Sequence, residues 1–121
     1  MPHLTLEYTA NLDFDVQALL KDLHLTLDAT GAIRMRGLKS RAVSQADYRI
    51  ADGNPAYAFA HVSLLIREGR SLEVKEELAR RALAVLKSHL GLRQEEGYLS
   101  LSVDIKEMGL GTSLTDHNIP G

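Results

Sequence analysis

The feature that most constrains the fold of this chain is an order of elements, strand, helix, strand, that occurs twice in 121 residues. Each half begins with a strand-forming segment, continues with helical periodicity, and ends with a second extended segment. Two parallel strands joined by a helix make a β-α-β unit, in which the helix crosses over one face of the sheet. The repeat therefore predicts an α+β fold, in which two fused β-α-β units give a four-stranded sheet with two helices on one face.

The first half shows both periodicities. Residues 3–8 alternate apolar and polar side chains, which predicts a strand. A helix is expected next, with Asn11 or Asp13 at its N-cap and Gly31 as its stop. Its apolar positions at helical spacing are Val16, Leu19, Leu20, Leu23 and Leu27. A second extended segment is expected from about residue 38 to residue 48.

The second half follows the same order. Residues 57–66 are apolar and rich in strand formers, and Ser71 is placed to cap a helix that Gly91 should end. Residues 98–105 alternate again and predict the last strand. Two ion pairs four residues apart are expected on the wet side of the helix, Glu76 with Arg80 and Glu77 with Arg81.

The length favours a single domain over residues 1–121, with repeats at about 2–50 and 56–107 and a tail at 108–121. The tail is either loose or docked on a neighbour.

With both helices on one side, the other face of the sheet is left uncovered. A face bearing Leu, Val and Ile would not stay in water, so we expect a homo-oligomer.

Composition excludes several functions. The absence of cysteine rules out disulfides, thiolate metal sites and cysteine nucleophiles, and the five histidines show no metal-binding pattern. The net charge of -2 argues against a general nucleic-acid surface. No stretch is long and apolar enough for a membrane span, and the first residues lack the pattern of a signal peptide. We therefore expect a cytoplasmic protein with no metal, no nucleic acid and no membrane partner.

Pro2 is the first candidate for chemistry. A proline in this position permits an aminopeptidase to remove Met1, which would leave Pro2 with a free secondary amine. Such an amine is a general base when burial or nearby cations lower its pKa toward neutrality. The alternative is that proline is simply a common second residue. If Met1 is retained, the Pro2 nitrogen is an amide and cannot act as a base.

Basic residues supply the other candidates. Lys39 and Arg41 lie two apart on an expected strand and therefore share a face, and with Arg34 and Arg36 they form the densest basic cluster in the chain. Such a pair can bind a carboxylate and stabilise a dienolate, or can form a solvated basic edge that discourages aggregation. Arg70, in the turn before the second helix, can complete an anion site or be an exposed turn arginine.

Taken together, an ordered set of short blocks resembles the 5-carboxymethyl-2-hydroxymuconate isomerase family of the tautomerase superfamily. The blocks are Met1-Pro2-His3, Thr30-Gly31, Leu38-Lys39-Ser40-Arg41, Ala51-Asp52-Gly53, Tyr57-Ala58-Phe59-Ala60-His61 and Gly69-Arg70-Ser71-Leu72-Glu73. No single block is specific, and the order and spacing of the set carry the resemblance, which runs from Pro2 to about Glu107.

The resemblance implies a trimer that ketonises a small carboxylated dienol in the meta-cleavage degradation of homoprotocatechuate, without cofactor or metal. It implies that Pro2 moves the proton, and that Lys39, Arg41 and Arg70 bind substrate, with one of the two arginines supplied by a neighbouring subunit. At Lys39 the family pattern has arginine; lysine keeps the charge and loses the bidentate fork. Two alternatives remain: a tautomerase relative acting on another small unsaturated acid, and a non-catalytic oligomeric ligand-binding protein on the same fold.

Overall fold

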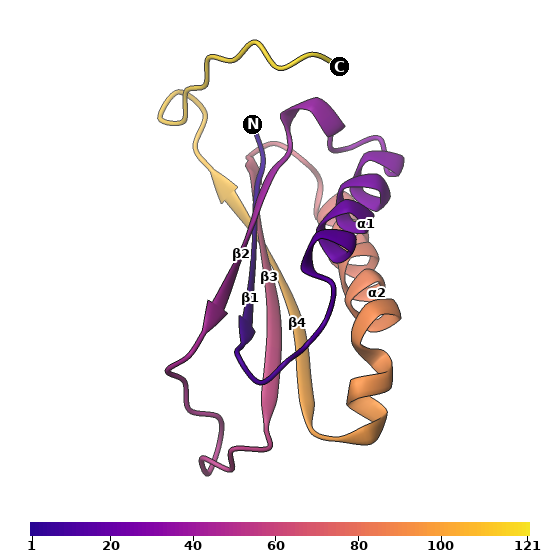
Figure 1. Ribbon diagram of the computed structural model, residues 1–121. Coiled ribbons are helices and arrows are strands. Elements are labelled where there is room, and N and C mark those ends of the chain that lie inside the picture. The colour runs from indigo at the N-terminus through magenta and orange to yellow at the C-terminus, as the bar shows by residue number, and fades with distance from the viewer.

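The computed structural model describes residues 1–121 and contains one four-stranded sheet and two long helices. In chain order the elements are β1 (His3–Thr9), α1 (Val16–Ala29), a short 3-10 helix η1 (Met35–Gly37), β2 (Lys39–Gln45), β3 (Ala58–Arg67), α2 (Leu72–Glu96) and β4 (Leu99–Met108). Both helices lie on the same side of the sheet (Figure 1). The predicted α+β fold is therefore confirmed.

The strands are ordered β2-β1-β3-β4 across the sheet. β1 runs parallel to β2 and β3 runs parallel to β4, so each helix joins two parallel neighbours, as the repeat predicts. The two units meet where β1 pairs with β3 in the antiparallel direction, with His3 opposite Leu65. This pairing brings the start of β1 beside the end of β3, at the end of the sheet where the N-terminus lies (Figure 1).

The hydrophobic core lies between the sheet and the two helices. Alternate residues of β1 and β3, such as Leu4, Leu6 and Leu64, are fully buried against apolar residues of α1 and α2. Twenty buried residues form one continuous cluster. Each leucine or valine in it contributes about 1.5–3 kcal/mol through burial, so the core accounts for the attachment of both helices to one face.

The face of the sheet opposite the helices is mostly polar, and the expectation of a face bearing Leu, Val and Ile is wrong. Its polar residues, by strand register, are His3, Thr5 and Glu7 from β1, Lys39, Arg41 and Gln45 from β2, His61 and Ser63 from β3, and Ser100, Ser102, Asp104 and Lys106 from β4. The alternation of period two sends most of the apolar residues of these strands toward the helices and leaves Val43, Phe59 and Leu65 on the opposite face. Association across this face would therefore rest mostly on polar contacts.

Helix α1 begins later than the sequence predicts. Its N-cap is Asp15, whose carboxylate accepts a hydrogen bond from the Ala18 N–H at 3.0 Å. Asn11 instead donates its side-chain amide to the Tyr57 carbonyl at 2.8 Å and so ties the segment before α1 to the segment before β3. The predicted stop is confirmed, because the helix ends at Ala29 and Gly31 has a positive φ of 78°.

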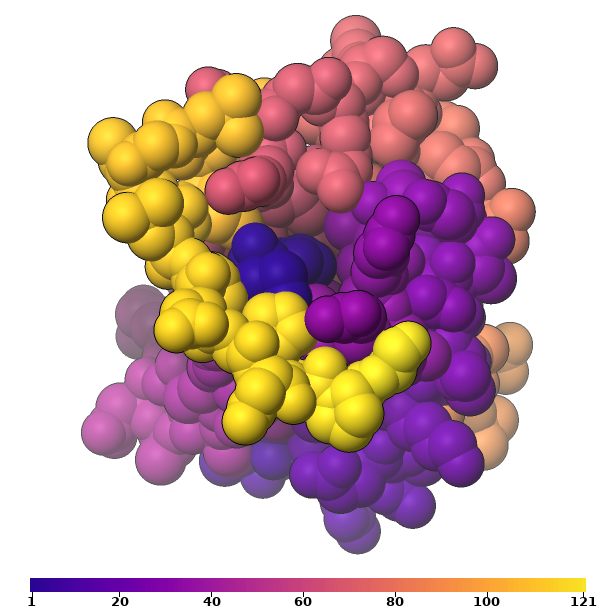
Figure 2. Space-filling view, turned by 90° about the horizontal axis from the view of Figure 1, so that it is seen from above, coloured from indigo at the N-terminus to yellow at the C-terminus, as the bar shows by residue number.

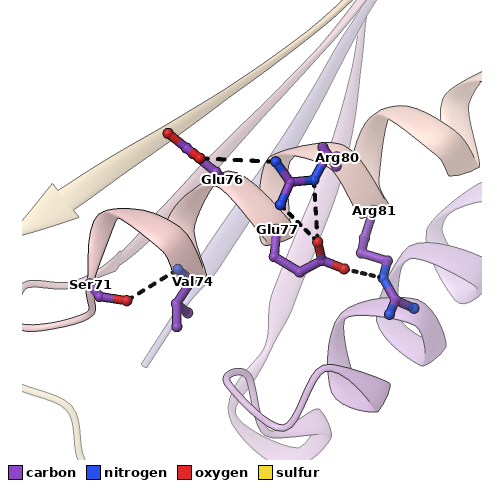
Figure 3. Close-up of polar contacts among 6 residues, drawn as sticks. All are labelled: Ser71, Val74, Glu76, Glu77, Arg80 and Arg81. Carbon is purple, nitrogen blue, oxygen red and sulfur yellow. Dashed lines mark hydrogen bonds and ion pairs between the residues drawn. The ribbon is translucent and has the colours of Figure 1, made fainter.

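Helix α2 begins as predicted and ends later. The Ser71 hydroxyl accepts from the Val74 N–H at 3.2 Å (Figure 3). Gly91 does not end the helix, which continues to Glu96 and buries Leu90. A glycine inside a helix costs about 1 kcal/mol. After Gly91, Arg93 donates to the Ala56 carbonyl at 3.3 Å and Gln94 donates to the Leu99 carbonyl at 3.0 Å, and these contacts hold the last turns of the helix. Neither helix combines the length and the apolar character that crossing a membrane requires.

The ion pairs predicted on α2 are confirmed. Glu77 contacts Arg81 at 2.7 Å, and Glu76 contacts Arg80 at 3.9 Å (Figure 3). Glu77 also accepts from Arg80 at 3.0 Å, and hydrogen bonds from both arginines lower the pKa of its carboxyl group. These pairs are exposed to solvent, so they stabilise the helix only slightly.

The core predicts the effect of truncating one face of α2. Leu78 is fully buried and Leu92, in the same helix, is 68% exposed. We expect Leu78→Ala to lower the free energy of unfolding by about 2–5 kcal/mol, because it removes buried methyl groups and leaves a cavity. Leu92→Ala should change it by less than about 0.5 kcal/mol. Urea unfolding of both variants checks this; equal losses would contradict the placement of the core.

Candidate active site

A cavity of about 710 Å³ lies at the end of the sheet that holds the N-terminus. Its lining comes from four separate parts of the chain: Met1 and Pro2; Gly31, Ala32, Ile33, Arg34, Arg36 and Gly37; Ile66, Arg67 and Arg70; and Thr115 and His117. Figure 2 looks down on this end, where the indigo N-terminus lies between the purple segment before β2, the pink segment after β3 and the yellow tail. The cavity thus surrounds Pro2.

The backbone fixes Pro2 at the floor of this cavity. The Lys39 N–H donates to the Pro2 carbonyl at 3.2 Å and extends the pairing of β1 with β2 by one residue. Gly37 is buried beside the N-terminus, and a Cβ there would lie only 3.0 Å from the Met1 Cε. A side chain at position 37 would therefore have to move the end of the Met1 side chain.

The charge of the cavity is strongly positive. Four arginines line it, Arg34, Arg36, Arg67 and Arg70, and no aspartate or glutamate does. Burial first, and then the charges of Arg67, Lys39 and Arg70, lower the pKa of the Met1 amine from its usual value of 8.0. A terminal amine in this position therefore loses its proton more easily than an exposed one, as a general base requires.

Arg70 reaches the cavity but uses its donors within the protein. Its Nε and Nη2 donate to the Ala32 carbonyl at 3.2 and 2.7 Å, and its Nη1 donates to the Arg67 carbonyl at 3.3 Å. The side chain therefore joins the loop after α1 to the turn after β3, which are two walls of the cavity. Its charge acts on the site while its nitrogens hold the walls together.

Lys39 and Arg41 lie on one sheet face, as predicted, but neither lines the cavity. The Arg41 Nη2 lies 2.8 Å from the His3 Nδ1. Arginine can only donate, so this His3 nitrogen accepts. Burial and the charges of Arg41 and Lys39 lower the pKa of His3, which favours the neutral ring that this contact needs. The Lys39 Nζ is buried and has no hydrogen-bond partner.

Sequence reasoning missed the side of the cavity formed by Arg67 and the tail. Arg67 is the last residue of β3, and only the antiparallel pairing of β1 with β3 brings it near Pro2. The tail turns back over the cavity, where its Leu110 N–H donates to the Glu68 carboxylate at 3.3 Å and Thr115 and His117 join the lining. A basic residue at the end of a strand antiparallel to the first one was the available signal for Arg67.

No group of three or more histidine, aspartate or glutamate side chains is arranged to hold a metal ion. The lining of the cavity offers a terminal amine with a lowered pKa, surrounded by guanidinium groups. Such a site can remove a proton from an acidic group of a substrate and can stabilise the anion that results.

Comparisons with known proteins give a consistent result. Residues 2–120 match the model of a family described as 5-carboxymethyl-2-hydroxymuconate isomerase. The chain is similar to 5-carboxymethyl-2-hydroxymuconate Delta-isomerase of Escherichia coli, at 31% identity over 121 residues, covering 98% of this chain and 96% of that one.

Solved structures that are similar to this one include an isomerase and a fused trimeric protein. A 5-carboxymethyl-2-hydroxymuconate isomerase from Deinococcus radiodurans R1 superimposes with a TM-score of 0.92 at 37% identity, covering 98% of this chain and 90% of that chain. A fused 4-OT described as a symmetric trimer superimposes with a TM-score of 0.70 at 15% identity, covering 88% of this chain and 87% of that chain. The second likeness concerns the fold alone.

The contacts of Arg70 predict that lysine cannot replace it. Lysine keeps the charge but has one nitrogen, which cannot reach both the Ala32 and Arg67 carbonyls. We expect Arg70→Lys to lower the free energy of unfolding by about 1–3 kcal/mol, measured by urea unfolding. Arg67→Lys is the matched control, because the Arg67 side chain makes no hydrogen bond and is exposed. Equal stabilities of the two variants would show that these bonds contribute nothing.

Proposed function

The chain belongs to the 5-carboxymethyl-2-hydroxymuconate isomerase family, and we propose that it ketonises 5-carboxymethyl-2-hydroxymuconate with the N-terminal amine of Pro2 as general base. The family, the tautomerase fold and the isomerase class predicted from the sequence are confirmed. The proposal places the reaction in the meta-cleavage degradation of homoprotocatechuate. The single observation that carries the role of Pro2 is its position at the floor of the cationic cavity.

The proposed reaction moves one proton and one double bond. The neutral Pro2 amine takes the proton from the hydroxyl group of the dienol, and the electrons of that O–H bond form the carbonyl. The double bonds shift along the chain of the substrate, and the protonated amine returns the proton to a distal carbon. Atoms and electrons balance without a co-reactant, and the catalyst needs only a base that is neutral before the reaction and an acid after it.

The surrounding cations support this role in two ways. They favour the neutral form of the amine, as the lowered pKa of the terminal amine indicates. They also favour the dienolate, whose negative charge develops as the proton leaves. Lys39 contributes to both through its buried ammonium group, which has no other partner. Arg70 contributes charge from the wall that it holds in place.

The proposal assigns Arg41 to a neighbouring subunit. Arg41 is exposed on the polar face of the sheet and does not line the cavity of its own chain. Binding a substrate carboxylate would therefore require the cavity of another copy. A trimer is the assembly that we propose, with the symmetric trimer of the same fold as support. A cytoplasmic location is also part of the proposal.

The proposed trimer predicts the mass of the protein particle in solution. Sedimentation equilibrium should give three times the 13.3 kDa of one chain. A particle of one chain would remove the neighbouring subunit, and with it the proposed role of Arg41.

The mechanism predicts the effect of replacing Pro2. Loss of the dienol absorbance of 5-carboxymethyl-2-hydroxymuconate should be much faster with the protein than without it, and Pro2→Ala should abolish most of this acceleration while the oligomer stays intact. Intact-mass measurement must accompany the assay, because the amine is free only when Met1 has been removed. Full activity of Pro2→Ala, or of protein that retains Met1, would contradict the mechanism.

If correctly processed wild-type protein gives no acceleration, the substrate assignment is wrong. The remaining candidates are then another small unsaturated acid or a binding role.

A further inference from the structure

The guanidinium groups of Arg34, Arg36 and Arg67 have no partner within the protein. None of them makes a hydrogen bond or an ion pair, in contrast to Arg70, which donates from three nitrogens to backbone carbonyls. All three are exposed and line the cavity around Pro2. Three unpaired cations that converge on one cavity without any carboxylate in its lining leave a strong, unmatched positive field.

These three arginines lie on different walls. Arg34 and Arg36 belong to the segment between α1 and β2, and Arg67 ends β3. Figure 2 shows the two segments on different sides of the N-terminus, the first in purple and the second in pink. An anion bound to one wall would leave the cations of the other wall free. A molecule with a carboxylate at each end could contact both walls with its middle over Pro2.

We propose that Arg67 on one wall and Arg34 with Arg36 on the other form a carboxylate clamp, which makes this cavity select substrates with two or more carboxylates over those with one. The proposal rests on the proposed function and deepens it by naming the residues that recognise the substrate. It adds side chains of the cavity itself to the carboxylate contact proposed for Arg41 of a neighbouring subunit. The planar forks of these side chains are free for bidentate contacts, whereas the nitrogens of Arg70 are bound to backbone carbonyls.

The clamp fits the chemistry of the proposed substrate. Muconate carries a carboxylate at each end of a four-carbon diene, and the carboxymethyl group adds a further one. Two carboxylates held on different walls would place the diene between them, within reach of the amine. Holding the diene in a fixed orientation beside the amine raises the rate of proton transfer. The arginines would therefore affect binding and rate without taking part in proton transfer themselves.

A pair of unreactive probes tests the clamp directly. trans,trans-Muconate and sorbate share the same conjugated diene in a six-carbon chain, and sorbate has a methyl group where muconate has its second carboxylate. Neither has the hydroxyl group that ketonisation requires. Isothermal titration calorimetry of the wild-type protein should show muconate binding at least about tenfold more tightly than sorbate, since one charged hydrogen-bonded contact is worth about this factor.

Arg67→Gln should remove most of this preference, because sorbate can still use the other wall whereas muconate loses one of its two contacts. The double variant Arg34→Gln with Arg36→Gln should do the same from the opposite wall. Arg67→Lys keeps the charge without the fork and should restore the preference in part. Arg49→Gln is the matched control, because it removes the same charge from the loop between β2 and β3, at the other end of the sheet (Figure 1).

Two outcomes would overturn the proposal. An unchanged preference in Arg67→Gln would show that its guanidinium does not bind the second carboxylate. An equal loss for both probes, or a similar loss in Arg49→Gln, would show general electrostatic attraction instead of a clamp. Because neither probe turns over, the result is independent of the isomerase assay: the preference can hold while ketonisation fails, and ketonisation can proceed without the preference.

Discussion

The antiparallel pairing of β1 with β3 is the contact on which the rest of the structure depends. It joins the two β-α-β units into one sheet, and it places the start of the chain beside the end of β3. Pro2 and Arg67 are far apart in the sequence and become neighbours only through this register. The parallel pairing of β1 with β2 adds the second neighbour, since the backbone of Lys39 holds that of Pro2. The site therefore forms at the end of the sheet where the starts of β1 and β2 and the end of β3 lie side by side.

Placing a chain terminus in such a position has an electrostatic consequence. Burial and several cations act on the same amine, and both favour its neutral form, as the lowered pKa of the terminal amine shows. The same cations attract anionic substrates and stabilise an enolate. The cations on the walls of the cavity repel one another. Arg70 holds the walls together against this repulsion, because its guanidinium donates to backbone carbonyl oxygens of both walls. One set of charges thus serves binding and proton transfer together.

Local sequence patterns predicted the helices and strands. They failed where contacts between distant parts of the chain determine a helix end or the lining of the cavity. The alternation in β1 and the spacing of leucines in α1 identified both elements, since these patterns follow directly from backbone geometry. Gly91 was misread as a helix end, because hydrogen bonds from Arg93 and Gln94 to backbone carbonyls outside the helix offset the weak helix propensity of glycine. The polar uncovered face follows from the same alternation, which assigns apolar residues to the helix side. Lys39 and Arg41 were placed on the right face, but Arg67 and the tail residues reach Pro2 only through long-range pairing and chain return, which no local pattern encodes.

The most direct test of this account is the pKa of the Pro2 amine, measured by nuclear magnetic resonance in protein with ¹⁵N-labelled proline from which Met1 has been removed. We predict that this pKa lies below that of the same proline amine in the unfolded protein, and that it rises in Arg67→Gln, because Arg67 is the cation that most lowers the pKa of the Met1 amine at this position. A value in the folded wild-type protein at or above that of the unfolded protein would mean that the cationic cavity does not prepare the amine as a base, and the central claim would fail.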